Sequence, residues 1–350
     1  LRKEGSAYDL PIAIGILSAS GQIQPTRLES CCMMGELTLD GHLRPIKGVL
    51  PIAIQTKESG FSSLIVLKEN AKEAAVVSGL SVYGFDHIKD IISFLEGHDF
   101  PSEKIDLQVE FEKKQHYGLD FSDVKGQQSI KRCMEIAAAG GHNIILIGPP
   151  GSGKTILAKR LPTILPPMQL DEALETTKIH SVVGGIREDG LMSTRPFRSP
   201  HHTISDVALV GGGSYPQPGE ISLAHNGVLF LDELPEFKRS ALEVMRQPLE
   251  DREVTISRAK FSVNYPASFM LVASMNPSPS GYFNDDQAPI RSSQSEMQRY
   301  LSKISGPLLD RIDLHIEVNP VPFEKLSATK MGESSEVIRL RVSKARDIQR

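Results

Sequence analysis

The chain has no tryptophan and only three cysteines among its 350 residues. Cys31, Cys32 and Cys133 are odd in number and form no Cys-x-x-Cys pair, so the simplest expectation is a reduced, cytoplasmic compartment. Aromatic residues make up only 6% of the chain, so the composition gives no sign of an aromatic platform for stacking sugars or bases.

Long apolar runs and a surplus of positive charge are also missing. No stretch approaches the ~18 apolar residues that a membrane span needs, so we expect no membrane partner. The formal net charge of −4 argues against a globally basic nucleic-acid binder and leaves room for a local basic patch. The length suggests about two domains. Because the chain begins at Leu1 and ends in a charged, helical stretch, we expect a fragment of a longer protein.

Residues 1–97 show a mixture of helix and strand patterns. The apolar run Leu10–Leu17 suits either a buried helix or a strand, and alternation on both sides of Asp40-Gly41 predicts a hairpin. We further expect helices at 49–57, 69–77 and 88–95, and one short buried strand at 63–67. Residues 98–118, with Gly97-His98-Asp99-Phe100-Pro101 and a charged run, predict a linker.

From Asp120 onward, apolar strands alternate with helices. Helical periodicity covers residues 129–139 and 156–161, and buried strands are expected at 143–148, 227–232 and 269–274. This alternation predicts an α/β fold with a mostly parallel sheet and helices on both faces.

Residues 148–155 match the phosphate-loop pattern GxxxxGK[ST] in full, between a buried strand and a helix. Glycines let backbone N–H groups curl around phosphates, and the following helix directs its positive end at the anion. Lys154 is expected to reach the β- and γ-phosphates of ATP, and the Thr155 hydroxyl to bind Mg²⁺. The alternative is a Gly-Pro turn before a helix. The predicted nucleotide-binding residues of this loop are Gly148, Pro149, Pro150, Gly151, Ser152, Gly153, Lys154 and Thr155.

Two carboxylates, Asp232 and Glu233, end the buried strand that begins at Gly227. Ligands bind at the carboxyl ends of strands in open α/β sheets. We therefore expect Asp232 to hold Mg²⁺ and Glu233 to orient the attacking water. The alternative is an ordinary loop whose acids cap a helix.

Polar residues after the later strands suggest two further catalytic groups. Asn276 ends the strand at 269–274 and is placed to sense the γ-phosphate, unless it simply forms an Asn-Pro turn. Arg311 is a candidate to reach the nucleotide of a neighbouring subunit, as arginine fingers do. The alternative is a surface arginine paired with Asp310 or Asp313.

Residues 119–320 resemble the magnesium-chelatase-like AAA+ ATPases, most closely the ComM or YifB group. The matching stretches are Asp120–Gln127, Gly148–Thr155, Arg198–His202, Gly227–Glu233, Met275–Pro277 and Ser305–Asp313. The resemblance implies an AAA+ core at 119–335, the start of a truncated helical lid at 336–350, and adenine bound near Val124. It also implies a homo-hexameric ring, with Asn276 as sensor and Arg311 as finger.

Residues 1–97 resemble the Lon-protease-like domain of the same group, through Met34–Gly48 and Leu67–Asn70. The resemblance places the catalytic serine and lysine positions at Ile12 and near Leu50, which cannot act as nucleophile or base. We therefore expect an inactive α+β domain, lacking its first strands before Leu1, that serves interaction or ring assembly.

The group's zinc-ligand cysteines are replaced here by serines, so we predict no zinc. ComM-type proteins resemble helicases that drive branch migration of DNA in recombination and natural transformation. Candidate DNA-contacting segments are an insertion at 178–221 and a hairpin at 253–263 with Arg258 and Lys260 near its tip. The alternative is a solvated hairpin and an ordinary surface insertion.

Three functions therefore compete. The first is a DNA-remodelling motor powered by Mg-ATP, acting on branched or single-stranded DNA. The second is a chelatase-type or protein-remodelling subunit that acts on a protein partner. The third is a nucleotide-dependent scaffold with little turnover, which the presence of Glu233 argues against.

Overall fold

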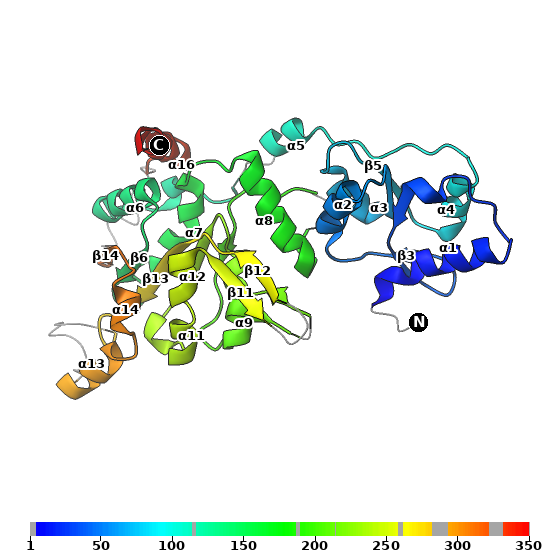
Figure 1. Ribbon diagram of the computed structural model, residues 1–350. Coiled ribbons are helices and arrows are strands. Elements are labelled where there is room, and N and C mark those ends of the chain that lie inside the picture. Colours follow the sequence, from blue (N-terminus) through cyan, green and yellow to red (C-terminus); the bar gives the residue numbers. More distant parts are fainter. Residues whose placement is uncertain are drawn as a thin grey trace. The chain divides into compact units, whose positions relative to one another are not determined.

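The computed structural model describes residues 5–113, 117–186, 190–213, 215–257, 262–281, 293–321 and 332–349. They form two compact units (Figure 1). The first contains Leu1–Lys114 and Leu170–Ser193, and the second contains Gln115–Gln169 and Thr194–Arg350. The chain therefore passes from one unit to the other at 114/115, 169/170 and 193/194.

The first unit contains a three-stranded parallel sheet in the order β1-β4-β5. A short antiparallel hairpin, β2–β3, turns at Asp40-Gly41 as predicted. The strands are β1 Cys31–Met33, β2 Glu36–Leu37, β3 Leu43–Arg44, β4 Ser63–Leu67 and β5 Ser81–Phe85. The helices are α1 Asp9–Ala19, α2 Val49–Glu58, α3 Lys68–Ala75, α4 Ile88–Leu95, α5 Leu107–Lys113 and α8 Leu170–Val183.

Alternation along the central strand β4 explains the layers of the first unit. Ile65 and Leu67 pack into a core with α1 and α4, whereas Leu64 and Val66 pack into a second core with α2 and α3. Successive residues of a strand point to opposite faces, so a central strand that is apolar throughout needs a cover on both sides. The apolar run at Leu10–Leu17 is accordingly a helix, α1.

Helix α8 packs against α2 within the first unit. The Gly48 amide donates to the Ser181 carbonyl at 2.9 Å, and the Leu50 amide lies 3.4 Å from the Ser181 hydroxyl. The expected insertion at 178–221 is therefore divided, because residues up to Ser193 cluster with the first unit and the rest with the second. The expected linker at 98–118 contains a helix, α5.

The second unit is built on a five-stranded parallel sheet in the order β14-β6-β13-β10-β7. Its strands are β6 Ile144–Ile147, β7 Phe197–Arg198, β10 Val228–Leu231, β13 Met270–Met275 and β14 Leu314–Glu317. Shorter antiparallel pairs are β8 Gly211–Gly212 with β9 Gln217–Pro218, and β11 Glu253–Ser257 with β12 Ser262–Pro266. The helices are α6 Gln128–Gly140, α7 Lys154–Ile164, α9 Asp206–Val210, α10 Glu220–Leu223, α11 Arg239–Glu243, α12 Arg246–Asp251, α13 Gln294–Leu301, α14 Gly306–Leu309 and α16 Ser335–Gln349.

Both faces of this sheet are buried. Along β10, Val228 and Phe230 point into one core while Leu229 and Leu231 point into the other. The first core includes α6, α7 and α16, and the second includes α11 and α12. The predicted parallel α/β core with helices on both faces is therefore confirmed.

The hairpin expected to contact DNA is only partly described. The hairpin expected at 253–263 is present as β11–β12, but Arg258 and Lys260 lie outside the described residues.

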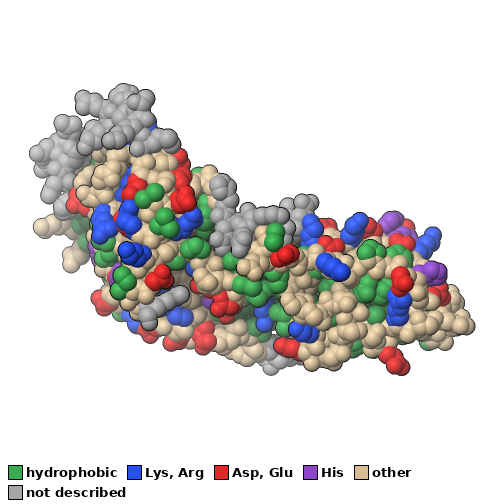
Figure 2. Space-filling view, turned by 90° about the horizontal axis from the view of Figure 1, so that it is seen from above, with side chains coloured by type: hydrophobic (Ala, Val, Ile, Leu, Met, Phe, Trp, Pro, Cys, Tyr) green, Lys and Arg blue, Asp and Glu red, His purple; other side chains and the backbone are tan. Residues whose placement is uncertain are grey.

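On the face shown in Figure 2, basic and acidic side chains are interspersed, in keeping with the net charge of −4. None of the helices in the described ranges combines the length and the apolar character needed to cross a bilayer.

Candidate functional site

The phosphate-loop residues connect β6 to α7 at the carboxyl edge of the sheet. A side chain at Gly148 would place its Cβ 2.2 Å from the carbonyl oxygen of Val318, so the loop can lie against the end of β14 only with glycine there. Gly151 and Gly153 have φ values of +76° and +92°, which L side chains rarely adopt. The glycines of the motif are thus required by this backbone.

Lys154 is 8% exposed and is the first residue of α7. Its ammonium donates to the carbonyl oxygens of Gly148 at 2.6 Å and Pro149 at 2.9 Å, and to Asn276 Oδ1 at 3.3 Å. Burial lowers the pKa of Lys154, and the nearby carboxylates Asp232 and Glu233 oppose that shift. The lysine is therefore held at the loop by acceptors that a phosphate can replace.

The Asp232 carboxylate is shared by two hydroxyl groups. Leu231 pairs with Ala273 in the parallel ladder, so the next residues, Asp232 and Ser274, lie level on adjacent strands. Ser274 Oγ donates to Asp232 Oδ1, and Thr155 Oγ1 donates to Asp232 Oδ2 at 2.9 Å. Hydroxyl and carboxylate oxygens are the ligands that Mg²⁺ prefers, so Thr155 and Asp232 fit the predicted metal role.

Glu233 sits in the left-handed region, with φ 54° and ψ 52°. Its amide lies 3.2 Å from Asp232 Oδ1 and 3.3 Å from Ser274 Oγ, which supports this uncommon backbone conformation. The side chain is 54% exposed, and His202 Nδ1 lies 3.6 Å from its Oε2. The carboxylate is thus presented at the surface beside Asp232 rather than used as a helix cap.

Asn276 follows β13 and lies beside the lysine of the phosphate loop, as the contact above shows. Tyr300, in α13, donates its hydroxyl to the Asn276 carbonyl oxygen at 3.1 Å. Burial raises the pKa of Tyr300 to about 12, and Glu236 and Glu233 add to the shift. Tyr300 therefore stays protonated as a donor near neutral pH and fixes the backbone that carries the predicted sensor.

The segment expected near the adenine contacts the phosphate loop through Gln127. Its amide Nε2 donates to the Ser152 carbonyl oxygen at 2.8 Å and to that of Asn319 at 3.3 Å. Val124 is only 5% exposed and packs in the hydrophobic core. The Val124 carbonyl accepts a hydrogen bond from buried Lys131.

Arg311 lies apart from the other predicted catalytic residues. Its backbone carbonyl accepts from Asn143, directly before β6, whereas the phosphate loop follows β6. Its guanidinium pairs with Glu250 of α12 and donates to the Pro307 carbonyl oxygen at 2.7 Å. Neither Asp310 nor Asp313 forms this pair. The backbone of Arg311 is thus at the end of β6 remote from the loop.

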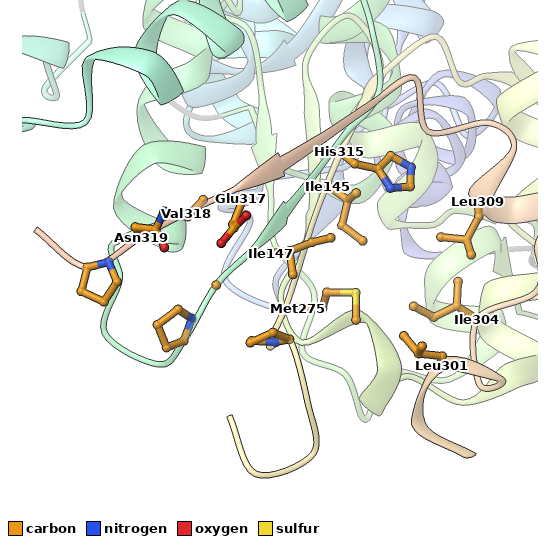
Figure 3. Close-up of a pocket in the computed structure, with 14 residues that line it drawn as sticks. Ile145, Ile147, Met275, Leu301, Ile304, Leu309, His315, Glu317, Val318 and Asn319 are labelled. Carbon is orange, nitrogen blue, oxygen red and sulfur yellow. The ribbon is translucent and has the colours of Figure 1, made fainter. Parts of the chain in front are cut away.

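An apolar pocket of about 700 Å³ lies next to the phosphate loop without containing the catalytic groups. Figure 3 shows Ile145, Ile147 and Met275 from the sheet facing Leu301, Ile304 and Leu309 across it. Gly148 and Pro149 form part of its wall, but Lys154 and Glu233 do not. Thr155 and Ser274 instead contact Asp232, and Lys154 contacts Asn276.

The structure therefore brings together Lys154, Thr155, Asp232, Glu233 and Asn276, and leaves Arg311 apart. Sequence reasoning missed several contributing residues, because each depends on contacts between distant segments. These are Gln127, His202, Ser274 and Tyr300.

Comparisons with known proteins agree with this geometry. The family model "Magnesium chelatase, subunit ChlI" matches residues 120–326, and a second model, "Subunit ChlI of Mg-chelatase", matches residues 1–70. The chain is 47% identical over its whole length to the competence protein ComM of Haemophilus influenzae, covering 69% of that protein. It is 45% identical to the uncharacterized protein YifB of Escherichia coli, covering 68% of it.

Two more distant relatives match parts of the chain. Lon protease 2 of Bacillus subtilis is 29% identical over 158 residues, and the magnesium-chelatase 67 kDa subunit of Chlorobaculum parvum is 28% identical over 164. These alignments cover 41% and 46% of the chain and only 27% and 24% of the relatives. The full-length matches decide the assignment: the chain belongs to the magnesium chelatase subunit ChlI family, as a ComM/YifB-type, magnesium-chelatase-like AAA+ protein.

Proposed function

We propose that this protein hydrolyses Mg-bound ATP and that a ring of its subunits uses the turnover to move branched or single-stranded DNA. The observation that carries the hydrolysis proposal is the arrangement around Asp232, whose carboxylate accepts from Thr155 while Glu233 lies exposed beside it. A protein that only bound nucleotide would not need the second carboxylate.

In the proposed mechanism each residue has a separate task. Lys154 leaves the loop carbonyls to bind the β- and γ-phosphates, and Glu233 orients the attacking water. Thr155 and Asp232 hold Mg²⁺, which neutralises charge on the phosphates when bound. Asn276, fixed by Tyr300 and close to Lys154, reports the state of the γ-phosphate.

The ring proposal rests on the placement of Arg311. Because its backbone lies at the end of β6 opposite the phosphate loop, it is badly placed to serve the loop of its own subunit. A finger that completes the neighbour's site requires at least two subunits in contact, and a closed ring gives every site one finger.

The proposed DNA substrate is supported by the relative named as a competence protein and by the β11–β12 hairpin. A second candidate function is a motor that acts on a protein partner. The similarity to a magnesium-chelatase subunit supports it.

ATP turnover with and without forked DNA, at several salt concentrations, distinguishes the DNA motor from the motor that acts on a protein partner. We expect DNA to raise kcat, the effect to fade with salt, and Glu233→Gln to lower kcat about 10²-fold or more while retaining ATP binding. Turnover that depends on Glu233 but ignores every DNA tested would reject the DNA motor and favour the protein partner. Turnover unaffected by Glu233→Gln would reject the assigned site.

A further inference from the structure

Arg311, the proposed finger, pairs with a carboxylate from another element. Its Nη2 forms an ion pair with Oε1 of Glu250, which lies in the last turn of α12. Its Nη1 donates to the Pro307 carbonyl oxygen at 2.7 Å. The Nε atom is buried and, among the described residues, has no hydrogen-bond partner. The direction of the guanidinium is therefore set at its two terminal nitrogens.

The backbone of Arg311 is held against the sheet. Its carbonyl oxygen accepts from Asn143 Nδ2 at 2.9 Å. Asn143 is 7% exposed, and its Oδ1 accepts from the Leu271 amide of β13 at 2.8 Å. These bonds fix where the arginine side chain begins but not where it ends. Because a long side chain has many rotamers, a contact at the guanidinium is needed to keep it in one direction.

Glu250 also stands on a fixed base. The preceding residue, Leu249, is 7% exposed and packs in the core that covers one face of the sheet. Two residues after Glu250, the Arg252 carbonyl oxygen accepts from the Ala267 amide at 2.7 Å. The Arg252 guanidinium donates to the Phe269 carbonyl oxygen at 3.0 Å. The end of α12 is thus tied to the segment between β12 and β13, so the fold determines where the Glu250 carboxylate lies.

The ion pair leaves part of the guanidinium available to a ligand. Arginine has five N–H bonds, four of them on the terminal nitrogens. The contacts with Glu250 and Pro307 use one bond on each terminal nitrogen, so each nitrogen keeps a second one. The Arg311 side chain is 28% exposed and that of Glu250 is 50% exposed, so a neighbouring subunit can reach the pair. A phosphate oxygen can therefore accept from Arg311 without displacing the carboxylate.

We propose that Glu250 is a positioning residue that aims the Arg311 guanidinium at the nucleotide of the neighbouring subunit. This inference rests on the proposed role of Arg311 as a finger in the neighbour's site. A donor stabilises the transition state only if it lies where charge develops, and a displacement of about 1 Å can cost ~10²-fold in rate. A charge-assisted contact fixes direction as well as distance, so less ordering of the finger remains when two subunits meet.

The first test measures ATP turnover by full-length Glu250→Ala, Glu250→Gln and Arg311→Ala proteins and by the Glu250→Ala/Arg311→Ala double variant. We expect Glu250→Ala to lower kcat about 10- to 100-fold with KM for ATP unchanged, because the finger acts in the transition state. Glu250→Gln keeps an acceptor oxygen and should lose less. In the double variant, Glu250→Ala should add nothing to the loss from Arg311→Ala. Asp251→Ala, which removes an exposed carboxylate from the same helix, should match wild type.

Mixing subunits shows in which subunit Glu250 acts. Arg311→Ala subunits lack the finger and keep Glu233, whereas Glu233→Gln subunits have an inactive site and keep the finger. Each alone should turn over little ATP, and their mixture should regain turnover wherever an intact site meets an intact finger. Adding Glu250→Ala to the Glu233→Gln subunit should abolish this recovery. Adding it to the Arg311→Ala subunit should leave the recovery in place.

The outcomes separate this inference from the proposed function. If Glu250→Ala has a wild-type or raised kcat, raises KM alone, or multiplies the loss from Arg311→Ala, the inference is wrong and the finger stands. If sedimentation shows that Glu250→Ala does not assemble, Glu250→Gln is judged by the same criteria. If Arg311→Ala turns over ATP like wild type, the finger and this inference both fail, and Glu233→Gln still decides whether the assigned site hydrolyses ATP.

Discussion

At the scale of single residues, Glu73 is a buried charge in the first unit. It is 4% exposed, and its Oε1 accepts from the Leu50 amide at 3.0 Å, at the start of α2. Burial raises the pKa of Glu73, while hydrogen bonds from Ser181, Leu50 and Val49 oppose the shift. A raised pKa in the folded state means that the folded protein binds the proton more tightly, so stability falls as pH rises through that pKa.

We expect Glu73→Gln to stabilise the protein near neutral pH by on the order of 1 kcal/mol, because the amide keeps an acceptor for Leu50 without the buried charge. Below the ordinary carboxyl pKa of 4.5 the advantage should vanish, because wild-type Glu73 is then protonated in both states. Urea unfolding from acidic to mildly alkaline pH measures this. Glu69→Gln, exposed on the same helix, is the control. If Glu73→Gln is less stable than wild type at neutral pH, the hydrogen bonds that the Glu73 carboxylate accepts stabilise the fold by more than the burial of its charge costs.

The site residues that sequence could predict are those carried by one continuous motif. Lys154 and Thr155 follow a buried strand within the loop pattern, and Asp232 and Glu233 follow another. Ser274 could not be assigned in the same way, since its contact with Asp232 depends on the register between β10 and β13. A register is a property of two distant segments and leaves no local pattern in either.

At the scale of elements, central strands were predicted and edge strands were missed. The central strands β6, β10 and β13 are apolar on both faces and appear as continuous apolar runs. The edge strand β14, Leu-His-Ile-Glu, has one exposed face, and β7 is only two residues long. Short, half-polar segments resemble loops, so only pairing with a neighbour defines them.

Helix α16, expected as the beginning of a lid, packs against α6 and α7 of the core. Arg341 Nε donates to Glu135 Oε1 of α6 at 2.7 Å, and Glu135 is 7% exposed. Arg341 also pairs with Glu333, and Arg132 gives Glu135 a second partner at 3.1 Å. Hydrogen bonding from Arg341 holds the pKa of Glu135 below its ordinary value. The contact thus fixes the helix to the core through a buried carboxylate.

We expect Arg341→Met to destabilise the second unit by about 1–2 kcal/mol, less than for a fully buried pair because the arginine is partly exposed and Arg132 remains. A carboxyl group whose pKa is lowered in the folded state stabilises the protein above its ordinary pKa, and this stabilisation is lost as the pH falls. The difference in stability between wild type and Arg341→Met should therefore shrink at low pH. Adding Glu135→Gln to Arg341→Met should recover part of the loss. Urea unfolding measures these stabilities, with Lys344→Met as the exposed control on the same helix. If the double variant loses as much stability as Arg341→Met, and if that loss is the same at low pH, the ion pair is ruled out as the cause.

At the scale of the whole molecule, the sequence could not show that α8 belongs to the first unit. The helix lies between the phosphate-loop helix α7 and strand β7 in the chain, yet its neighbours in space are α2 and the segment before it. Its own pattern gives the helix but not the partner, because several apolar surfaces compete for it. Its packing against α2 and its contacts with Gly48 and Leu50 place it in the first unit.

Hydrogen exchange on the full chain can test this division. A non-hydrolysable ATP analogue with Mg²⁺ stabilises only the conformations to which it binds, by about 2.7 kcal/mol at ~100-fold excess over Kd. We expect slower exchange in α7, β10 and β13, which carry the proposed site, and no change in α2, β4 or α8. Glu73→Gln should do the reverse and slow exchange in α2, β4 and α8 together, because amides that open in one cooperative unit share its free energy of opening. If α8 instead followed α7 in both experiments, it would belong energetically to the second unit, and the contacts of Ser181 with Gly48 and Leu50 would contribute little to holding it.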